Sequence, residues 1–368
     1  MNLENLRTLI QCYEDNLELI YNKNHDELFK WRAVKHFRDV WYAPENEGLS
    51  FAQRFNKAKK QSSVLIDNSR VSPSNGVVKL AELDEREVER LFFDVLLADD
   101  GGDINLRQNH MEAFMEGMEA LRMKHYPQNW KYKQDDRHAT SCYMCFFAPD
   151  DNFIYHYTEV ETFAQYIEYG IDIGSGRNFK LDAYYKMCEE VIDVLRESTS
   201  LLGKHKGYID SDEFYDDPDL HLLAFNLIWC SNTYNFYRGM THASKKESIK
   251  EYTLAKLREK EQAELEVKRN EKLDEIRQLE SELAPYEEIS LLGVQVTQKK
   301  YGTGTVIAQA VNVITVDFGD CKMKYKINRS IIARPTFEDD EEIVAAFTEY
   351  EDKKRILDRL YRELESIK

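Results

Sequence analysis

The residues best suited to bind a ligand are a group of lysines and arginines near the C-terminus. Residues 291–335 contain seven lysines and arginines against two aspartates, a formal charge of +5, whereas the whole 368-residue chain carries −17. A basic surface on an acidic protein is typical of a module that contacts phosphate groups. An acidic surface of the same chain or of a partner is the alternative target. The residues predicted to bind nucleic acid or a partner protein are Lys299, Lys300, Lys322, Lys324, Lys326 and Arg329.

A second basic group lies near the N-terminus, where residues 1–80 hold 12 lysines and arginines against 10 acidic residues. It is a secondary candidate for contact with backbone phosphates. The solvated face of an ordinary helix explains the same pattern. Its members are Arg32, Lys35, Arg38, Lys57, Lys59 and Lys60.

Three carboxylates close together in the sequence are candidates for metal-dependent catalysis. Asp99, Asp100 and Asp103 could hold a divalent cation, because hard cations prefer carboxylate oxygens. A metal-dependent nuclease or hydrolase is therefore the alternative function. The sequence Asp-Asp-Gly-Gly-Asp is more typical of a solvated turn between helices. We therefore favour a non-catalytic binding or adaptor protein.

A Cys-x-x-Cys pair with two histidines nearby is the best candidate for a transition-metal site. Cys142 and Cys145, together with His138 and His156, could supply the four ligands that zinc prefers. Residues 139–148 predict a β-strand, however, in which the two cysteines point to opposite faces. No serine or cysteine stands in the setting of a catalytic nucleophile. We therefore expect neither a bound metal nor a cofactor.

Two long charged helices are predicted on either side of the C-terminal basic module. Residues 246–284 contain no glycine or proline and are rich in good helix formers, which predicts one long helix that ends at Pro285. Residues 340–367 predict a second helix. We expect the apolar stripes of the two to pair as an antiparallel coiled-coil arm. Separate packing on the N-terminal body, or pairing between two chains of a homo-oligomer, are the alternatives. The heptad positions of the second helix are Ile343, Tyr350, Leu357 and Leu364.

The basic module shows alternating apolar and polar residues in five short stretches. Residues 311–318 and 321–327 are the clearest, and residues 331–333 form the last. Short alternating strands separated by glycine-containing turns predict a small, strongly bent β-barrel at the tip of the arm. Gly302 and Gly304 fit the bends of its second strand better than a phosphate-binding loop. The sequence KKYGTGTV…ITVDFGDCKMKYKI resembles the Tudor-like and KOW-like barrels that are appended to nucleic-acid machines.

The N-terminal part of the chain predicts a mainly helical body with a small mixed sheet. Amphipathic helix patterns recur from residue 3 onward, and residues 139–148 and 152–158 predict two strands around a turn. The expected fold class is α+β. The predicted domains are a recognition body (1–207), an acidic linker with the last body helix (208–244), a first arm helix (245–290), the barrel (291–336) and a returning arm helix (337–368).

Five stretches between residues 28 and 170 carry a resemblance to a known family. They are FKWRAVKHFRDVWY, FAQRFNKAKKQSSVLIDN, PSNGVVKLAELDEREVERLFFDVLLAD, NWKYKQDDRHATSCYMCFFAPDDNFIYHY and FAQYIEYG. Their spaced aromatic and apolar positions resemble the N-terminal module that precedes the ATPase in McrB-like AAA proteins of bacterial restriction systems. The resemblance implies a recognition or adaptor module in defence against foreign DNA, with DNA, RNA or a protein of such a system as partner. No Walker A lysine motif is present, so no motor activity is implied.

The N-terminal residues bear on the cellular location, because a signal peptide or a membrane span needs a long apolar run. Charged residues interrupt Met1–Tyr21, so no apolar run there is long enough for a signal peptide or a membrane span. We expect a cytoplasmic protein without a membrane partner. Its six cysteines are then expected to be reduced.

Overall fold

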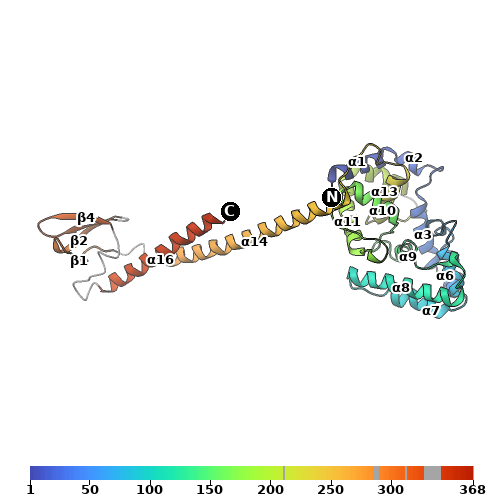
Figure 1. Cartoon of the computed structure of the whole chain (residues 1–368), viewed down its shortest axis with the longest axis horizontal. Helices are drawn as coiled ribbons and strands as arrows, with labels where there is room; N and C mark the ends of the chain where they lie inside the picture. The colour runs from blue at the N-terminus through green and yellow to red at the C-terminus, as the bar shows by residue number, and fades with distance from the viewer. Residues whose placement is uncertain (210–211, 285–289, 311–312, 327–340, 368) are drawn as a thin grey trace. The chain divides into compact units, whose positions relative to one another are not determined.

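The computed structural model describes residues 1–209, 212–284, 290–310, 313–326 and 341–367. The chain divides into two compact units, Met1–Leu254 and Ala255–Lys368 (Figure 1). Each unit has an apolar core of its own. None of the described helices has the length and apolar character that a membrane crossing requires.

The first unit consists of helices and loops, and no strand occurs among its described residues. Its first half contains α1 (Leu3–Asp15), α2 (Leu17–Tyr21), α3 (Phe29–Trp41), η1 (Pro44–Asn46), α4 (Phe51–Ala58), α5 (Ser63–Ile66), α6 (Pro73–Ala81), α7 (Glu85–Arg90) and the π-helical turn η2 (Leu91–Leu96). Its second half contains α8 (Ile104–His125), η3 (Trp130–Tyr132), α9 (Arg137–Phe147), α10 (Tyr157–Tyr166), η4 (Gly176–Asn178), α11 (Leu181–Glu197), α12 (Thr199–Ile209), α13 (His221–Thr233) and the start of α14 (Lys245–Leu283).

Helix α13 lies at the centre of this unit. Its apolar residues occur on all sides, and most of them, from Leu222 to Cys230, are buried. A helix without a polar face is stable only when other helices surround it. Helices α1, α10 and α11 pack against α13 and supply that environment.

The prediction of two strands around residues 149–151 is wrong. Residues 139–147 belong to helix α9, whose N-terminus is capped by the Asp136 carboxylate, which accepts hydrogen bonds from the backbone N–H groups of His138 and Ala139. Every residue from Ala139 to Phe147 is buried. Since no solvated face interrupts the apolar run, the sequence shows neither the helical nor the strand period clearly. The expected body sheet is absent from the described part of this unit.

Part of the acidic segment predicted as a linker is built into the first unit. Asp217 is buried and its carboxylate accepts hydrogen bonds from the backbone N–H groups of Leu222 and Leu223 and from the indole N–H of Trp31. The negative charge therefore lies at the N-terminus of α13, where exposed N–H groups need acceptors.

The second unit contains one antiparallel sheet of four described strands in the order β1-β2-β3-β4. The strands are β1 (Gln295–Gln298), β2 (Gly302–Ala310), β3 (Val313–Asp317) and β4 (Lys322–Lys326). One face carries the buried residues Leu291, Val294, Val296, Val306, Ile314 and Val316. The described strands do not close into a barrel, because β1 pairs with β2 and β4 with β3 and neither outer strand pairs with the other. The fifth strand predicted at residues 331–333 lies outside the described residues.

The two predicted long helices are confirmed as α14 and α16 (Glu341–Ser366). Lys272 lies 3.1 Å from Glu363, and Lys353 lies 3.2 Å from Glu282, so the two helices run in opposite directions within the second unit. Ile276, Leu283 and Leu360 are buried along them, and Tyr350 packs against the apolar face of the sheet. Among the predicted heptad positions, the side chain of Ile343 lies outside the described part of the chain.

Candidate nucleic-acid interface

The predicted binding lysines lie in two places on the sheet of the second unit. Lys299 and Lys300 form the turn between β1 and β2, and Lys322, Lys324 and Lys326 belong to β4. Lys299, Lys300, Lys322 and Lys324 are exposed. Arg329 lies outside the described residues.

The strand register places Lys322 and Lys324 on the solvated face of the sheet. Lys324 is opposite Thr315, and Lys322 is opposite Asp317. Between them, Met323 is opposite the buried Val316 on the apolar face. Because successive side chains of a strand point to opposite faces, the alternation Lys-Met-Lys-Tyr in β4 keeps lysines out and apolar residues in.

Threonines and glutamine extend the solvated face across β1 and β2. The side-chain amide of Gln295 donates to the hydroxyl of Thr305 at 2.8 Å, and the hydroxyls of Thr297 and Thr303 lie 3.3 Å apart. This face is therefore polar and contains hydroxyl groups beside the lysines. Such groups are common ligands for phosphate and sugar oxygens.

Acidic residues neutralise little of the lysine charge. Lys322 lies 3.5 Å from Asp317, on the neighbouring strand, and both side chains are partly solvated. Lys299 and Lys324 have no acidic partner among the described residues. The ammonium group of Lys300 lies 5.2 Å from the centre of the Tyr301 ring, a cation–π distance.

An aromatic contact holds the turn that carries Lys299 and Lys300. The rings of Tyr301 and Phe318 are 5.6 Å apart, so they join the start of β2 to the end of β3. Gly302 has φ +76°, a conformation that a residue with a side chain adopts with strain. Neither aromatic residue was among the predicted site residues, although Tyr301 precedes Gly302 and Phe318 precedes Gly319 in the sequence.

The six residues of the secondary basic group are mostly engaged in contacts within the first unit. Arg32 is paired with Asp26, Lys35 lies 2.6 Å from Asp39, and the Arg38 guanidinium donates to the carbonyl of Phe147. The ammonium groups of Lys57 and Lys59 donate to Asn46 and Asn75, and burial lowers the pKa of Lys59. Lys60 is exposed. A role of this group in phosphate binding stays a prediction, and Arg32 and Lys35 are already paired with carboxylates.

The carboxylates proposed for metal-dependent catalysis have structural partners. Asp100 forms an ion pair of 2.6 Å with Arg107, and the hydrogen bonds from Arg107 lower the pKa of this carboxyl. Asp103 caps the N-terminus of α8, and Asp99 accepts from the backbone N–H of Gly101. They form the turn that the sequence favoured. Nowhere in the described chain do three or more His, Cys, Asp or Glu side chains converge as metal ligands would.

The histidines beside the Cys-x-x-Cys pair lie close together, and Nε2 of His138 lies 3.9 Å from Sγ of Cys142, but nearer acceptors face the nitrogens of this ring. The rings of His138 and His156 are 4.7 Å apart. Nδ1 and Nε2 of His138 lie 2.8 and 2.7 Å from the carbonyl oxygens of Tyr155 and Leu65, so both nitrogens face acceptors rather than an open ligand position. Burial raises the pKa of the Cys142 and Cys145 thiols, which favours the protonated form that metals do not bind.

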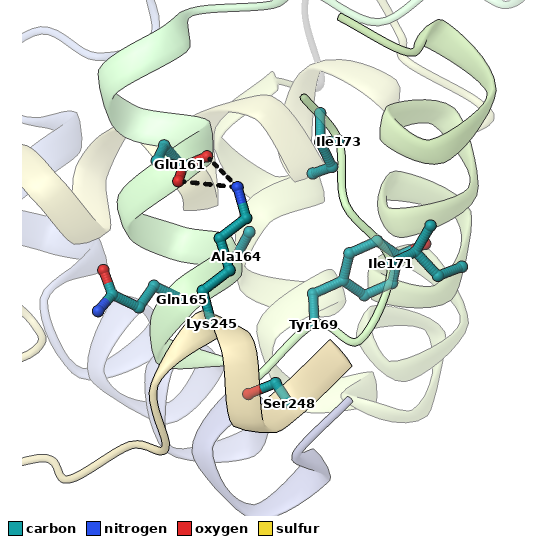
Figure 2. Close-up of a pocket in the computed structure, with 8 residues that line it drawn as sticks. All are labelled: Glu161, Ala164, Gln165, Tyr169, Ile171, Ile173, Lys245 and Ser248. Atoms are coloured by element: carbon teal, nitrogen blue, oxygen red, sulfur yellow. Dashed lines mark hydrogen bonds and ion pairs between the residues drawn. The ribbon is translucent and has the colours of Figure 1, made fainter. Parts of the chain in front are cut away.

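A small pocket lies where α14 begins (Figure 2). The ammonium group of Lys245 points to the carboxylate of Glu161 on α10 and also lies 3.0 Å from Asp172. Burial lowers the pKa of Lys245, but its hydrogen bonds to these two carboxylates outweigh that effect and raise it. The charges compensate one another, so this cluster fastens the first turn of α14 rather than presenting a charge to a ligand. Since 84 residues separate Lys245 from Glu161, no local pattern reveals the contact.

Comparison with protein-family models, with curated proteins and with solved structures gave no match to this chain.

Proposed function

We propose that this chain is a non-catalytic binding protein that contacts the phosphate backbone of nucleic acid through the lysines of its four-stranded sheet. The observation that carries the proposal is the solvated sheet face, where Lys324 has no described acidic partner and stands beside hydroxyl-bearing residues. Phosphate contacts of this kind supply most of the affinity of sequence-independent nucleic-acid binding.

The position of the lysines supports a role in binding rather than a role only in preventing edge-to-edge pairing of sheets. Lysines on an outer strand also prevent sheets from pairing edge to edge, and β4 is an outer strand of the described sheet. That explanation covers Lys322 and Lys324 but not Lys299 and Lys300, which lie in a turn. Binding of a polyanion accounts for both sets.

The two long helices fit the same proposal as a support for the sheet. In this proposal α14 and α16 form an antiparallel coiled coil, and Tyr350 of α16 connects it to the apolar face of the sheet. The resemblance of residues 28–170 to the module of McrB-like restriction proteins supports a place for this binding protein in bacterial defence against foreign DNA.

The test is a salt titration of nucleic-acid binding with the full-length chain. Fluorescence anisotropy is measured with labelled duplex DNA, single-stranded DNA and RNA. We expect the Lys299→Glu/Lys324→Glu variant to bind at least about tenfold more weakly. The slope of log K against log salt concentration should also be smaller by about 1 to 2, because fewer counterions are released from the nucleic acid when phosphate contacts are lost.

The matched control is Lys260→Glu/Lys268→Glu, which changes two exposed lysines of α14 in the same unit. Both variants have the same net charge, so a general repulsion would weaken them equally. Equal loss in the two variants, or unchanged binding by the sheet variant, would exclude the sheet as the nucleic-acid interface.

A further inference from the structure

The turn that carries Lys299 and Lys300 lies at the same end of the sheet as the turn between β3 and β4. Thr305, near the start of β2, is opposite Asp317 at the end of β3, and Asp317 is opposite Lys322 at the start of β4. The β1–β2 turn leads directly into β2, so the strand register places both turns at one end. Lys299, Lys300 and Lys322 therefore lie at the same end of the sheet.

Three aromatic rings follow one another at this end. The rings of Tyr301 and Phe318 are 5.6 Å apart, and those of Phe318 and Tyr325 are 6.2 Å apart. All three side chains are partly exposed. Among the described residues, Phe318 and Tyr325 pack against the apolar core of the unit, whereas Tyr301 does not. The core therefore does not explain why a large aromatic ring stands at residue 301.

The hydroxyl of Tyr325 has an unmet need for a hydrogen bond. Its oxygen is shielded from solvent and has no partner in the described part of the chain. Desolvation raises the pKa of Tyr325, so the hydroxyl is neutral at pH 7 and can both donate and accept. A shielded polar atom without a partner costs free energy, which a polar group of a ligand at this end would recover.

The charge around the rings favours an anionic ligand. Three lysines lie at this end against two aspartates, Asp317 and Asp320, and the ammonium group of Lys300 lies 5.2 Å from the centre of the Tyr301 ring. Aromatic rings also bind methylated ammonium groups, but the lysines here would repel a cation. A single nucleic-acid strand offers phosphates together with flat bases that are free to stack, whereas a duplex keeps its bases paired inside.

We propose that this end of the sheet binds single-stranded nucleic acid, with a base stacked on the ring of Tyr301 and the adjoining phosphates on Lys299 and Lys300. The inference rests on the proposed function and names the substrate class of the same site. Every base has a flat π face, so stacking of this kind tolerates any sequence. The lysines supply the charge attraction and the aromatic ring selects strands with unpaired bases.

Fluorescence anisotropy of the full-length protein with two labelled strands of equal length tests the proposal. One is a single-stranded DNA, and the other is the same strand with abasic sites, which keeps the phosphates but has no bases to stack. We expect the natural protein to prefer the intact strand about fivefold or more. Both strands carry the same charge, so counterion release does not produce this preference. Single-stranded RNA should compete with the intact strand.

Tyr301→Leu keeps an apolar side chain but removes the ring, and it should bring the preference for the intact strand close to one. The matched control Tyr361→Leu makes the same change at an exposed tyrosine of α16 in the same unit and should keep the preference. The preference of the natural protein needs no variant, so it decides the outcome even if Tyr301→Leu does not fold.

The outcomes separate this inference from the proposed function. Absence of binding to every nucleic acid would overturn both. Equal binding of the intact and abasic strands by the natural protein, with both weakened in Lys299→Glu/Lys324→Glu, would overturn the stacking and leave the phosphate contacts in place. A peptide that contains trimethyl-lysine represents the cationic ligand, and tighter binding of this peptide than of the single strand would also overturn the inference.

Discussion

At the scale of single residues, the first unit contains a buried chain of hydrogen-bonded polar side chains. It joins Glu27, Lys30, Asn226, Tyr13, Tyr21 and His205, with the hydroxyl of Tyr21 2.8 Å from Nδ1 of His205. Nε2 of His205 is buried and has no hydrogen-bond partner among the described residues. Such networks fix one core arrangement when they are satisfied, and an unsatisfied end is a weak point.

His205 should make the stability of the first unit depend on pH. Burial lowers its pKa to about 4, whereas the unfolded chain has the ordinary value of 6.5. Between these values the unfolded chain binds a proton that the folded chain does not bind. The free energy of unfolding should therefore fall as the pH drops from 6.5 to 4, by up to about 3 kcal/mol. Urea unfolding of His205→Gln across this range should show a flatter dependence.

The comparison between variants is decisive because other groups titrate in the same range. Burial raises the pKa of Asp217 from 3.8 to about 6, so as the pH falls the folded chain protonates this carboxyl before the unfolded chain does. Asp217 therefore adds to the free energy of unfolding at lower pH, which is the opposite of the effect of His205. The matched control is His25→Gln, which changes an exposed histidine outside this network. If the free energy of unfolding depends on pH in the same way for the natural protein and for His205→Gln from pH 4 to 6.5, burial does not lower the pKa of His205.

At the scale of elements, the sheet of the second unit depends on close packing at a glycine. A Cβ atom added at Gly304 would lie 2.6 Å from Cδ1 of Phe318 and 2.7 Å from the carbonyl oxygen of Asp317. Gly304→Ala must therefore push β2 away from β3 and should destabilise the second unit by about 1–3 kcal/mol. Thermal unfolding followed by circular dichroism measures this loss.

The matched control is a glycine with free space. Gly203 lies inside α12, and nothing lies within 4 Å of an added Cβ atom. Gly203→Ala should stabilise its unit by about 0.5–1 kcal/mol, because alanine restricts the unfolded chain. A Gly304→Ala protein as stable as the natural one would show that β2 and β3 are less tightly packed than the structure indicates.

The same elements show what the sequence can and cannot reveal. Helix α14 was predicted from 246 to 284 and runs from Lys245 to Leu283, because its composition and Pro285 determine it locally. Strands β3 and β4 also lie within the predicted stretches, where one solvated face imposes the alternation. Helix α9 was missed, because burial on every side removes that signal.

The sequence predicts the charged residues of the candidate site but not the partners of the second basic group. The lysines of the second unit stand out by charge, and the strand alternation gives their face. The carbonyl of Phe147 that accepts from Arg38 is 109 residues away, a tertiary contact that no local spacing encodes. The ion pairs of Lys245 with Glu161 and Asp172 likewise join residues far apart in the sequence, so they become visible only when the helices are packed.

At the scale of the whole molecule, the two separate cores predict two unfolding transitions. The apolar cluster of the first unit and the cluster around Val306 and Ile314 share no residue. Units with independent cores commonly unfold in separate steps. Differential scanning calorimetry of the full chain should therefore show two transitions rather than one.

Two variants assign the transitions, because each changes a buried contact of one unit. Lys30 is fully buried and paired with Glu27, so Lys30→Met leaves a buried carboxylate without its cation and should cost about 3–5 kcal/mol in the first unit. Gly304→Ala should lower the other transition alone. Helix α14 contributes residues to both units, and it is the element through which they could unfold together. A single transition that both variants lower would mean that this helix couples the cores into one cooperative structure.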